Sequence, residues 1–324
     1  MPHLPTAAAG LISGLFLLAA AGPSAAQTPL PVAMSEADFL TLLEDGTIDQ
    51  LQAACSESLA AGLDQRLQPL RSRLLEGWPA PQNTVLVMAN AAALIECRAP
   101  SAALTVLSRV GPAPGPTRRA WLVLRWQAAD AALDHRRAAR TLHRLVEGDL
   151  SRLDTVLLPV RREEDGTWTT RAAVDVLADH YEGMGAPDRA VEVLLASRSA
   201  GPETAQRLAR AAALMDDLAL ERRLLLLEQA LDQAAVDEAW GLALELLVLQ
   251  ESIERAAGGD AQRPRQRRDR LSRRLRDPYN QWRLLQDEAL DPESEARRQR
   301  LEERLRSPRD PGGHGASTLP QAGP

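Results

Sequence analysis

Residues 171–202 read RAAVDVLADHYEGMGAPDRAVEVLLASRSAGP, and this stretch decides the fold. Its first part repeats apolar residues every three or four positions, the spacing of one face of an α-helix, at Val174, Leu177, Ala178 and Tyr181. A second apolar set follows at Ala190 and Leu194, before Pro202. Small residues such as Ala178 and Ala190 allow two antiparallel helices to approach closely, and large ones such as Tyr181 fill the space beside them. The stretch therefore predicts a pair of packed helices.

The same order of residues occurs earlier in the chain. Residues 97–107 and 184–194 share Ala-Pro, then an alanine three residues after the proline, then Val-Leu, and residues 133–142 hold a weaker copy. The marker alanines Ala103 and Ala138 are 35 residues apart, and Ala138 and Ala190 are 52 apart. The first separation is close to the ~34-residue period of helix-hairpin repeats. The second indicates one period plus an insertion.

Residues 171–202 thus resemble a tetratricopeptide repeat. In the earlier copy the corresponding positions are held by Val87, Ala91, Leu94, Ala103 and Leu107. The resemblance covers residues 82–202 and implies an all-α fold, an α–α superhelix of tetratricopeptide-like helix hairpins. It also implies a groove, lined by the first helix of each hairpin, that binds a protein partner.

The composition agrees with a helical protein. Hydrophobic residues make up 45% of the chain and charged residues 25%, as in ordinary globular proteins, but aromatic residues make up only 3%. Alanine and leucine favour helix, and the scarcity of aromatic and β-branched residues disfavours a fold rich in strands. We expect no membrane span in the mature chain.

The first 26 residues are typical of an export signal. Residues 7–21 are apolar or small, which is too short for a comfortable membrane helix but suits a signal-peptide core. Gly22-Pro23 follows, and Ser24-Ala25-Ala26 predicts cleavage after Ala26. No arginine or lysine precedes the apolar core, so an uncleaved anchor is the alternative. We expect the mature chain in the bacterial periplasm or an equivalent lumenal compartment.

Two cysteines, Cys55 and Cys97, lie on helical faces that we expect to touch. In an oxidising compartment they could form a disulfide. The alternative is a pair of small buried thiols, because one possible pairing is no evidence of proximity.

Proline, glycine and changes in composition divide the rest of the chain into segments. Residues 27–257 form the predicted helical-repeat domain, in which residues 48–74 read as one helix that Pro69 kinks or splits. The insertion near 150–170 has a strand candidate at 155–160 and a turn signal at 164–167, which predicts a short hairpin or an ordered loop. Gly258-Gly259 marks a boundary before charged C-terminal helices at 258–306. Residues 307–324 are rich in Pro, Gly and Ser and predict a disordered tail.

The sequence contains no familiar catalytic motif. A phosphate loop, a dinucleotide-binding Gly-rich turn, a His-Glu-x-x-His pair and a Gly-x-Ser-x-Gly elbow are all absent. His135 and His143 are eight residues apart, a spacing on a helix that suits neither a metal pair nor an acid–base pair. We therefore predict no catalytic residues, no metal and no cofactor, and we expect His180 to be structural.

Carboxylates cluster on one predicted helix face. Asp175, Asp179 and Glu182 follow at spacings of four and three, and we expect Asp130 to extend this face from the neighbouring hairpin. The acidic face is either solvated or part of a groove for a basic or amphipathic peptide. The known tetratricopeptide clamp for C-terminal carboxylates uses Lys and Asn where this chain has Asp175 and Asp179, which argues against that activity.

Residues 263–310 hold more arginine than acid, although the whole chain has a net charge of −6. The run could be a solvated or partner-packed helix, or it could contact an anionic lipid or polymer surface. Nucleic acid is disfavoured, because the chain reads as exported and aromatic residues do not alternate with the arginines. The arginines concerned are Arg263, Arg265, Arg267, Arg268, Arg270, Arg273, Arg274 and Arg276.

Three functional hypotheses follow. The leading one is a non-enzymatic exported helical-repeat scaffold that mediates protein–protein interaction. The second is an accessory or assembly factor of the cell envelope that holds a polymer such as peptidoglycan, which a groove lined by tryptophan and arginine would favour. The third is an enzyme with an unrecognised site, which a deep pocket holding two carboxylates or a histidine pair would favour.

Overall fold

The computed structural model describes residues 34–78, 81–163, 165–215, 219–286 and 291–306. Within these ranges the chain forms fifteen α-helices, one short 3₁₀ helix and two strands, so the prediction of a helical fold class is confirmed. The predicted export signal and the predicted disordered tail lie outside the described residues. Among the described helices, none combines the length and the apolar character that crossing a bilayer requires.

The elements succeed one another with short connections. In chain order they are α1 (Glu36–Asp45), α2 (Ile48–Ala60), α3 (Asp64–Glu76), α4 (Thr84–Glu96), α5 (Pro100–Leu107), α6 (Pro116–Ala131), α7 (His135–Leu145), η1 (Leu150–Thr155), β1 (Leu157–Arg162), β2 (Trp168–Ala172), α8 (Ala173–Gly183), α9 (Pro187–Leu195), α10 (Pro202–Leu214), α11 (Leu220–Val236), α12 (Trp240–Ala256), α13 (Gln262–Arg274), α14 (Pro278–Leu284) and α15 (Pro292–Leu305).

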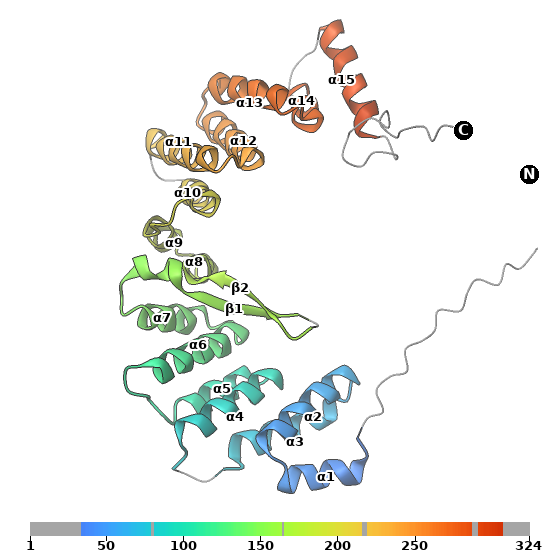
Figure 1. Cartoon of the computed structure of the whole chain (residues 1–324), viewed down its shortest axis with the longest axis vertical. Coiled ribbons are helices and arrows are strands. Elements are labelled where there is room, and N and C mark those ends of the chain that lie inside the picture. Colours follow the sequence, from blue (N-terminus) through green and yellow to red (C-terminus); the bar gives the residue numbers. More distant parts are fainter. Residues whose placement is uncertain (1–33, 79–80, 164, 216–218, 287–290, 307–324) are drawn as a thin grey trace, which may run out of the picture.

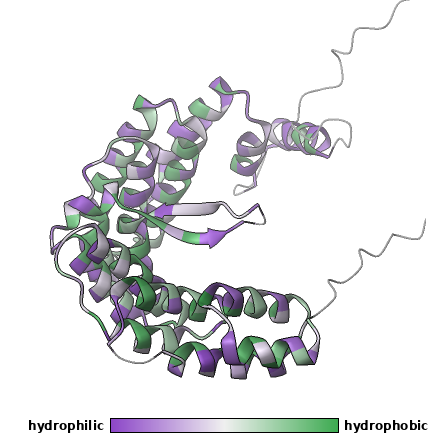
Figure 2. Ribbon diagram, turned by 60° about the horizontal axis from the view of Figure 1, so that its bottom comes forward, coloured by the Kyte–Doolittle hydropathy of each residue, from purple (hydrophilic) through white to green (hydrophobic). Residues whose placement is uncertain are grey.

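The helices are stacked along an open curve (Figure 1). Successive helices pack against each other, and α4 also contacts α6 while α10 also contacts α12. Figure 1 draws α6, α8 and α12 nearer the open side of the curve, and α7, α9 and α11 nearer its outside. The strands β1 and β2 extend towards the open side, and Figure 2 shows the same arrangement from a second direction.

One turn conformation recurs between paired helices. In each of seven turns between described α-helices a residue with positive φ is followed by a residue whose amide donates to a carbonyl five positions back, as in the Schellman motif. The positive-φ residues are Gly62, Arg98, Leu133, Gly185, Glu238, Gly258 and Arg276. The sequence copies at 97–107, 133–142 and 184–194 therefore begin with the same backbone geometry.

Small residues set the spacing within the stack. Ala178 of α8 and Ala190 of α9 are fully buried, as are Ala91 of α4 and Ala103 of α5. Leucines such as Leu194 fill the space beside them, as expected from the sequence. One buried apolar cluster runs from α1 to α10, and a second joins α10, α11 and α12.

The insertion contains a two-stranded antiparallel hairpin. Leu157 pairs with Ala172 and Leu158 with Arg171, and a bulge lies between Pro159 and Arg161. Leu158 is buried against the helices, whereas Leu157 and Trp168 expose 63% and 46% of their surface. The hairpin is therefore anchored at its base by Leu158, where Leu157 is exposed beside it, and it presents Trp168 next to the turn.

The prediction of a single helix over 48–74 is wrong. The chain breaks at 61–63, where Gly62 has a φ of +68°, and α3 then runs through Pro69. The break needs a left-handed backbone conformation, which glycine adopts without steric cost. Pro69 lies in the second turn of α3, and the helix continues through it.

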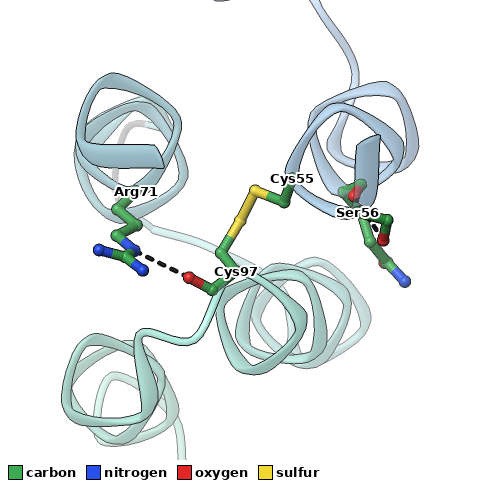
Figure 3. The surroundings of a disulfide bond; sticks show 5 residues. Cys55, Ser56, Arg71 and Cys97 are labelled. Carbon is green, nitrogen blue, oxygen red and sulfur yellow. Dashed lines mark hydrogen bonds between the residues drawn. A yellow bond between two sulfur atoms is a disulfide. The ribbon is translucent and has the colours of Figure 1, made fainter. Parts of the chain in front are cut away.

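A disulfide joins Cys55 of α2 to Cys97, the residue that follows α4 (Figure 3). Their Cα atoms are 5.1 Å apart, and both cysteines are fully buried. Arg71 of α3 donates from Nε to the carbonyl oxygen of Cys97 at 2.8 Å. The first two helix hairpins are therefore linked both covalently and by a hydrogen bond.

Candidate interaction site on the inner face

A polar cavity of about 560 Å³ lies beside the hairpin, between β2 and α10. We call it the inner cavity. Its walls combine residues from η1, both strands, α8 and α10, including Asp154, Thr170, Asp175, Glu203 and Arg207. The volume is in the range of ligand pockets in proteins, but the cavity is open and its lining is largely charged.

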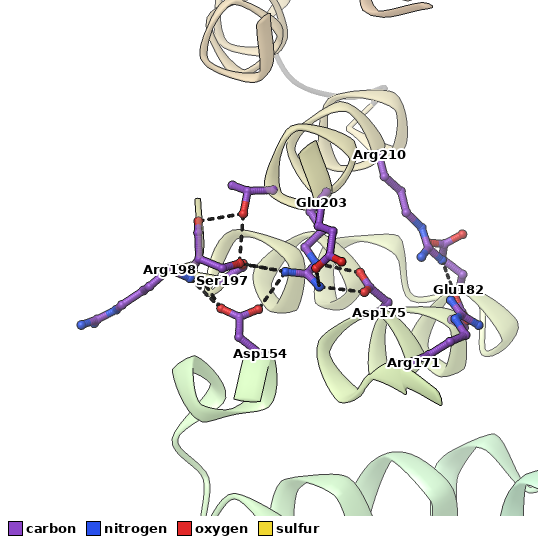
Figure 4. Close-up of polar contacts among 12 residues, drawn as sticks. Asp154, Arg171, Asp175, Glu182, Ser197, Arg198, Glu203 and Arg210 are labelled. Atoms are coloured by element: carbon purple, nitrogen blue, oxygen red, sulfur yellow. Dashed lines mark hydrogen bonds and ion pairs between the residues drawn. The ribbon is translucent and has the colours of Figure 1, made fainter. Parts of the chain in front are cut away.

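Arg207 is the centre of a polar network that includes Asp154, Asp175 and Ser197, which are labelled in Figure 4. Its side chain is only 4% exposed and donates twice to Asp175, from Nε and Nη2, at 2.8 Å each. Its Nη1 donates to Asp154 of η1 at 2.9 Å and to the hydroxyls of Ser197 and Ser199 at 3.1 Å. Hydrogen bonding to Asp175 raises the pKa of Arg207 despite the opposing effect of burial. The guanidinium therefore joins α10 to α8 and to η1.

Arg210, one turn further along α10, pairs with the rest of the acidic face. It donates from Nη2 to Asp179 at 2.6 Å and from Nε to Glu182 at 2.7 Å. Burial lowers the pKa of Arg210, but these two carboxylates outweigh burial and raise it. Asp179 also accepts from Arg171 of β2 at 2.7 Å (Figure 4).

The structure thus brings Asp175, Asp179 and Glu182 together on one face of α8, as the spacing predicts. Their charge is compensated by Arg171, Arg207 and Arg210 rather than presented as an acidic patch. Direct binding of a basic peptide by these carboxylates stays a prediction, and it requires competition with the three arginines.

Asp130, the fourth predicted binding residue, lies near a different group. Its Oδ1 is 3.9 Å from Nε2 of His180, and half of its side chain is exposed. His180 itself is buried and accepts from the indole Nε1 of Trp126 at 3.0 Å. Its Nδ1 lies 3.2 Å from Nδ1 of His135. The predicted structural role of His180 therefore has a defined geometry, which connects α6, α7 and α8.

The proton positions in this chain of contacts follow from chemistry. An indole nitrogen only donates, so Nε2 of His180 must accept, and the neutral ring then carries its proton on Nδ1. Nδ1 of His180 then donates a hydrogen bond to Nδ1 of His135. Burial lowers the pKa of His180, the nearby Asp130 opposes this effect, and His135 adds to it. Gly183 permits the arrangement, since a Cβ there would lie 2.9 Å from Nε2 of His135.

His143 and Tyr181 form a second contact between α7 and α8. Nε2 of His143 lies 2.7 Å from the phenolic oxygen of Tyr181. Burial lowers the pKa of His143 and raises that of Tyr181. His143 therefore has a specific partner across the contact between α7 and α8.

Most of the arginine run is engaged in ion pairs. Arg268 and Arg265 pair with the buried Glu251 of α12, and Arg267 pairs with Glu228 of α11. These contacts continue the packing across Gly258. Within the described part of the chain, the exposed residues Arg270, Arg274 and Arg276 have no ion-pair partner.

Arg207, Arg210 and Asp154 were not anticipated from the sequence. The spacing of Arg207 and Arg210 by three residues, against carboxylates spaced by four and three, is a signal of two complementary helix faces. The position of Asp154 depends on the path of the insertion, which local pattern does not define.

The described residues contain no group of three or more His, Cys, Asp or Glu side chains that could hold a metal ion. No protein-family model matches the sequence, and a search of curated proteins finds no match either.

Proposed function

We propose that this chain is an exported helical-repeat scaffold, similar to tetratricopeptide proteins, that binds a protein partner on the open side of its curve. The observation that carries the proposal is the hairpin of β1 and β2, which extends into the open side beside the inner cavity. It presents Leu157 and Trp168 in positions where they stabilise no core. Exposed tryptophan is typical of interaction hot spots.

The repeated turn geometry supports the tetratricopeptide-like part of the proposal. Seven described α-helix pairs are joined by the same backbone conformation, and alanines space α4 from α5 and α8 from α9 in the same way. The disulfide supports export, because disulfides persist in oxidising compartments and are rare in the cytosol.

The polar network of the inner cavity favours binding over catalysis. The oxygens of Asp154 and Asp175 that a general acid or base would offer to a substrate accept hydrogen bonds from Arg207. A polymer-binding groove would be lined by several tryptophans. The six tryptophans of this chain do not line one groove. They lie on the α3–α4 connection, α6, β2, α12 and α14, as Trp78, Trp121, Trp126, Trp168, Trp240 and Trp282.

Site-specific photocrosslinking in the source organism tests the proposal. A photoreactive amino acid replaces Trp168 on the hairpin, and a matched variant carries it at Arg189 of α9, an outer position with a 66% exposed side chain. We expect the photoreactive amino acid at position 168 to yield a discrete crosslinked protein in the envelope fraction, identified by mass spectrometry. At position 189 it should yield none.

Equal labelling from both positions would contradict a partner site on the hairpin. Crosslinking of Trp168 to glycan material alone would favour the polymer-binding alternative. Recovery of the chain only from the cytosolic fraction would contradict export.

A further inference from the structure

The outer side of the stack carries a second surface, which is separate from the inner cavity. The helices α11 and α13 flank α12 and lie on its outer side in Figure 1. A cavity of about 400 Å³ lies between them, with Trp240 and Leu247 of α12 as its floor. Its walls include Leu231 of α11 and Leu271 of α13. We call this cavity the outer trough.

The two ends of the outer trough differ. One end lies next to the ion pair in which Arg267 of α13 donates to Glu228 of α11 at 2.7 Å and 2.9 Å. Towards the other end, a smaller space of about 170 Å³ continues past Trp240 to Leu275. The exposed Val236 and Leu275 lie at the ends of α11 and α13 there. The trough thus has an apolar floor, and the space above it continues past Trp240 to Leu275.

The charge on the α13 wall indicates what could occupy the trough. Arg270 and Arg274 are one helical turn apart, line the cavity and are exposed. Within the part of the chain that the structure describes, neither has an ion-pair or hydrogen-bond partner, in contrast to Arg267. A guanidinium binds a carboxylate with two parallel hydrogen bonds. The wall therefore fits a ligand that has carboxylates beside an apolar body.

The charges on the opposite wall favour a peptide over a lipid surface as the ligand. Asp232 of α11 lines the trough, and Glu238 lines the space that continues past Trp240. These carboxylates oppose the close approach of a densely anionic bilayer. A peptide, unlike a bilayer, can carry its carboxylates only on the side that faces α13. The volume suits one or two large side chains, as in pockets that hold a short helix or an extended anchor.

We infer that the outer trough binds an acidic segment of a protein partner, which inserts a bulky apolar side chain against Trp240 and places carboxylates on Arg270 and Arg274. This site lies outside the inner cavity and does not rest on the function proposed for it.

A displayed library of random twelve-residue peptides tests the inference. Selection uses the immobilised mature chain, with counter-selection on the double variant R270E/R274E. We expect recovered peptides to carry Asp or Glu within one helical turn of Leu, Phe or Trp. Binding of a recovered peptide, measured by fluorescence anisotropy, should weaken about tenfold or more in R270E/R274E, because each carboxylate then faces a like charge.

Two further variants make the result specific. R276E/R300E carries the same change of charge at exposed residues outside the trough and should bind normally. A235W fills the trough from the exposed surface of α11 and should abolish binding while circular dichroism stays unchanged. Equal weakening in R276E/R300E, or no enrichment over counter-selection, would overturn the inference. So would binding of phosphatidylglycerol vesicles that depends on Arg270 and Arg274 and that the peptides do not displace.

Discussion

A single buried guanidinium determines how α10 is positioned on the stack. Arg207 has donors directed to Asp154 and Asp175 and is almost fully shielded from water. Such a group contributes geometry as much as stability, because the cost of dehydrating the charges offsets much of their attraction. Removing the arginine, however, leaves two carboxylates without their partner.

We predict that Arg207→Met lowers the free energy of unfolding by about 3 kcal/mol, the usual scale for breaking a buried ion pair. Urea denaturation followed by circular dichroism measures this change. Arg189→Met removes an exposed pair with Glu192 and should change stability by less than about 0.5 kcal/mol. Similar losses in both variants would show that Arg207 has no special structural role.

The buried histidine predicts a dependence of stability on pH. An unfolded histidine has a pKa of about 6.5, and burial lowers the pKa of His180 in the folded chain. Below about pH 6.5 the unfolded chain therefore binds more protons than the folded chain, so stability falls as the pH falls. Above that pH both states are neutral at this position and His180 contributes no pH dependence.

Urea denaturation at pH 7.5 and pH 5.5 measures this effect. We expect the wild-type chain to be less stable at pH 5.5, and His180→Gln to show a smaller loss. Glutamine retains an acceptor for Trp126, and His143 still contributes because burial also lowers its pKa. An unchanged loss in the variant would assign the pH dependence to other groups.

At the scale of the element, the recurring turn explains how a sequence with weak repeats forms regular hairpins. The left-handed position is glycine at residues 62, 185 and 258, but it is Arg98, Leu133, Glu238 and Arg276 in the other turns. A left-handed conformation costs a residue with a side chain about 1 kcal/mol relative to glycine. The turn persists because packing of the flanking helices outweighs that cost.

We therefore predict that Leu133→Gly stabilises the chain by up to about 1 kcal/mol, since Leu133 is 76% exposed and its side chain contributes little packing. The reverse change, Gly185→Leu, should destabilise it by a similar amount, because a side chain there meets no atom within 4 Å and only the backbone conformation is penalised. Differential scanning calorimetry compares the two. Shifts of the melting temperature in the same direction would contradict a shared turn geometry.

The helical elements were predictable because their signals are local. The spacing of Val174 to Tyr181 reports which side of α8 is buried, and Ala-Pro marks where α9 begins. The break at Gly62 was missed because apolar spacing continues across it and Pro69 is a stronger but misleading signal. The carboxylates of α8 were found for the same local reason. Their partners on α10 were not, because an ion pair between distant segments depends on how the helices stack.

At the scale of the whole molecule, the two ends of the curve are held by different means. The first hairpins are linked by the Cys55–Cys97 disulfide, which spans 42 residues in sequence. The last helices are joined largely through polar contacts, such as the ion pair of Arg268 with Glu251 and the hydrogen bond that Arg297 donates to Gln281. Closing a loop of this length contributes about 2–4 kcal/mol, largely by restricting the unfolded chain.

Hydrogen exchange followed by mass spectrometry should reveal this asymmetry. We expect the slowest exchange in residues 48–107 and faster exchange in 262–306, because fewer buried apolar contacts protect the latter. The double variant Cys55→Ala/Cys97→Ala should accelerate exchange in 48–107 and leave 262–306 unchanged. Uniform acceleration along the chain would indicate a single cooperative unit.

Because the disulfide lies near one end of the stack, the molecule should respond differently to pulling from its two ends. A protease or unfolding machine that pulls from the C-terminal side meets α15, α14 and α13 in turn and can detach them one at a time. A machine that pulls from the N-terminal side soon reaches a closed loop between Cys55 and Cys97 that it must pass as a doubled strand or reduce. The direction of pulling should therefore decide whether the chain is unravelled gradually or resists until its disulfide is reduced.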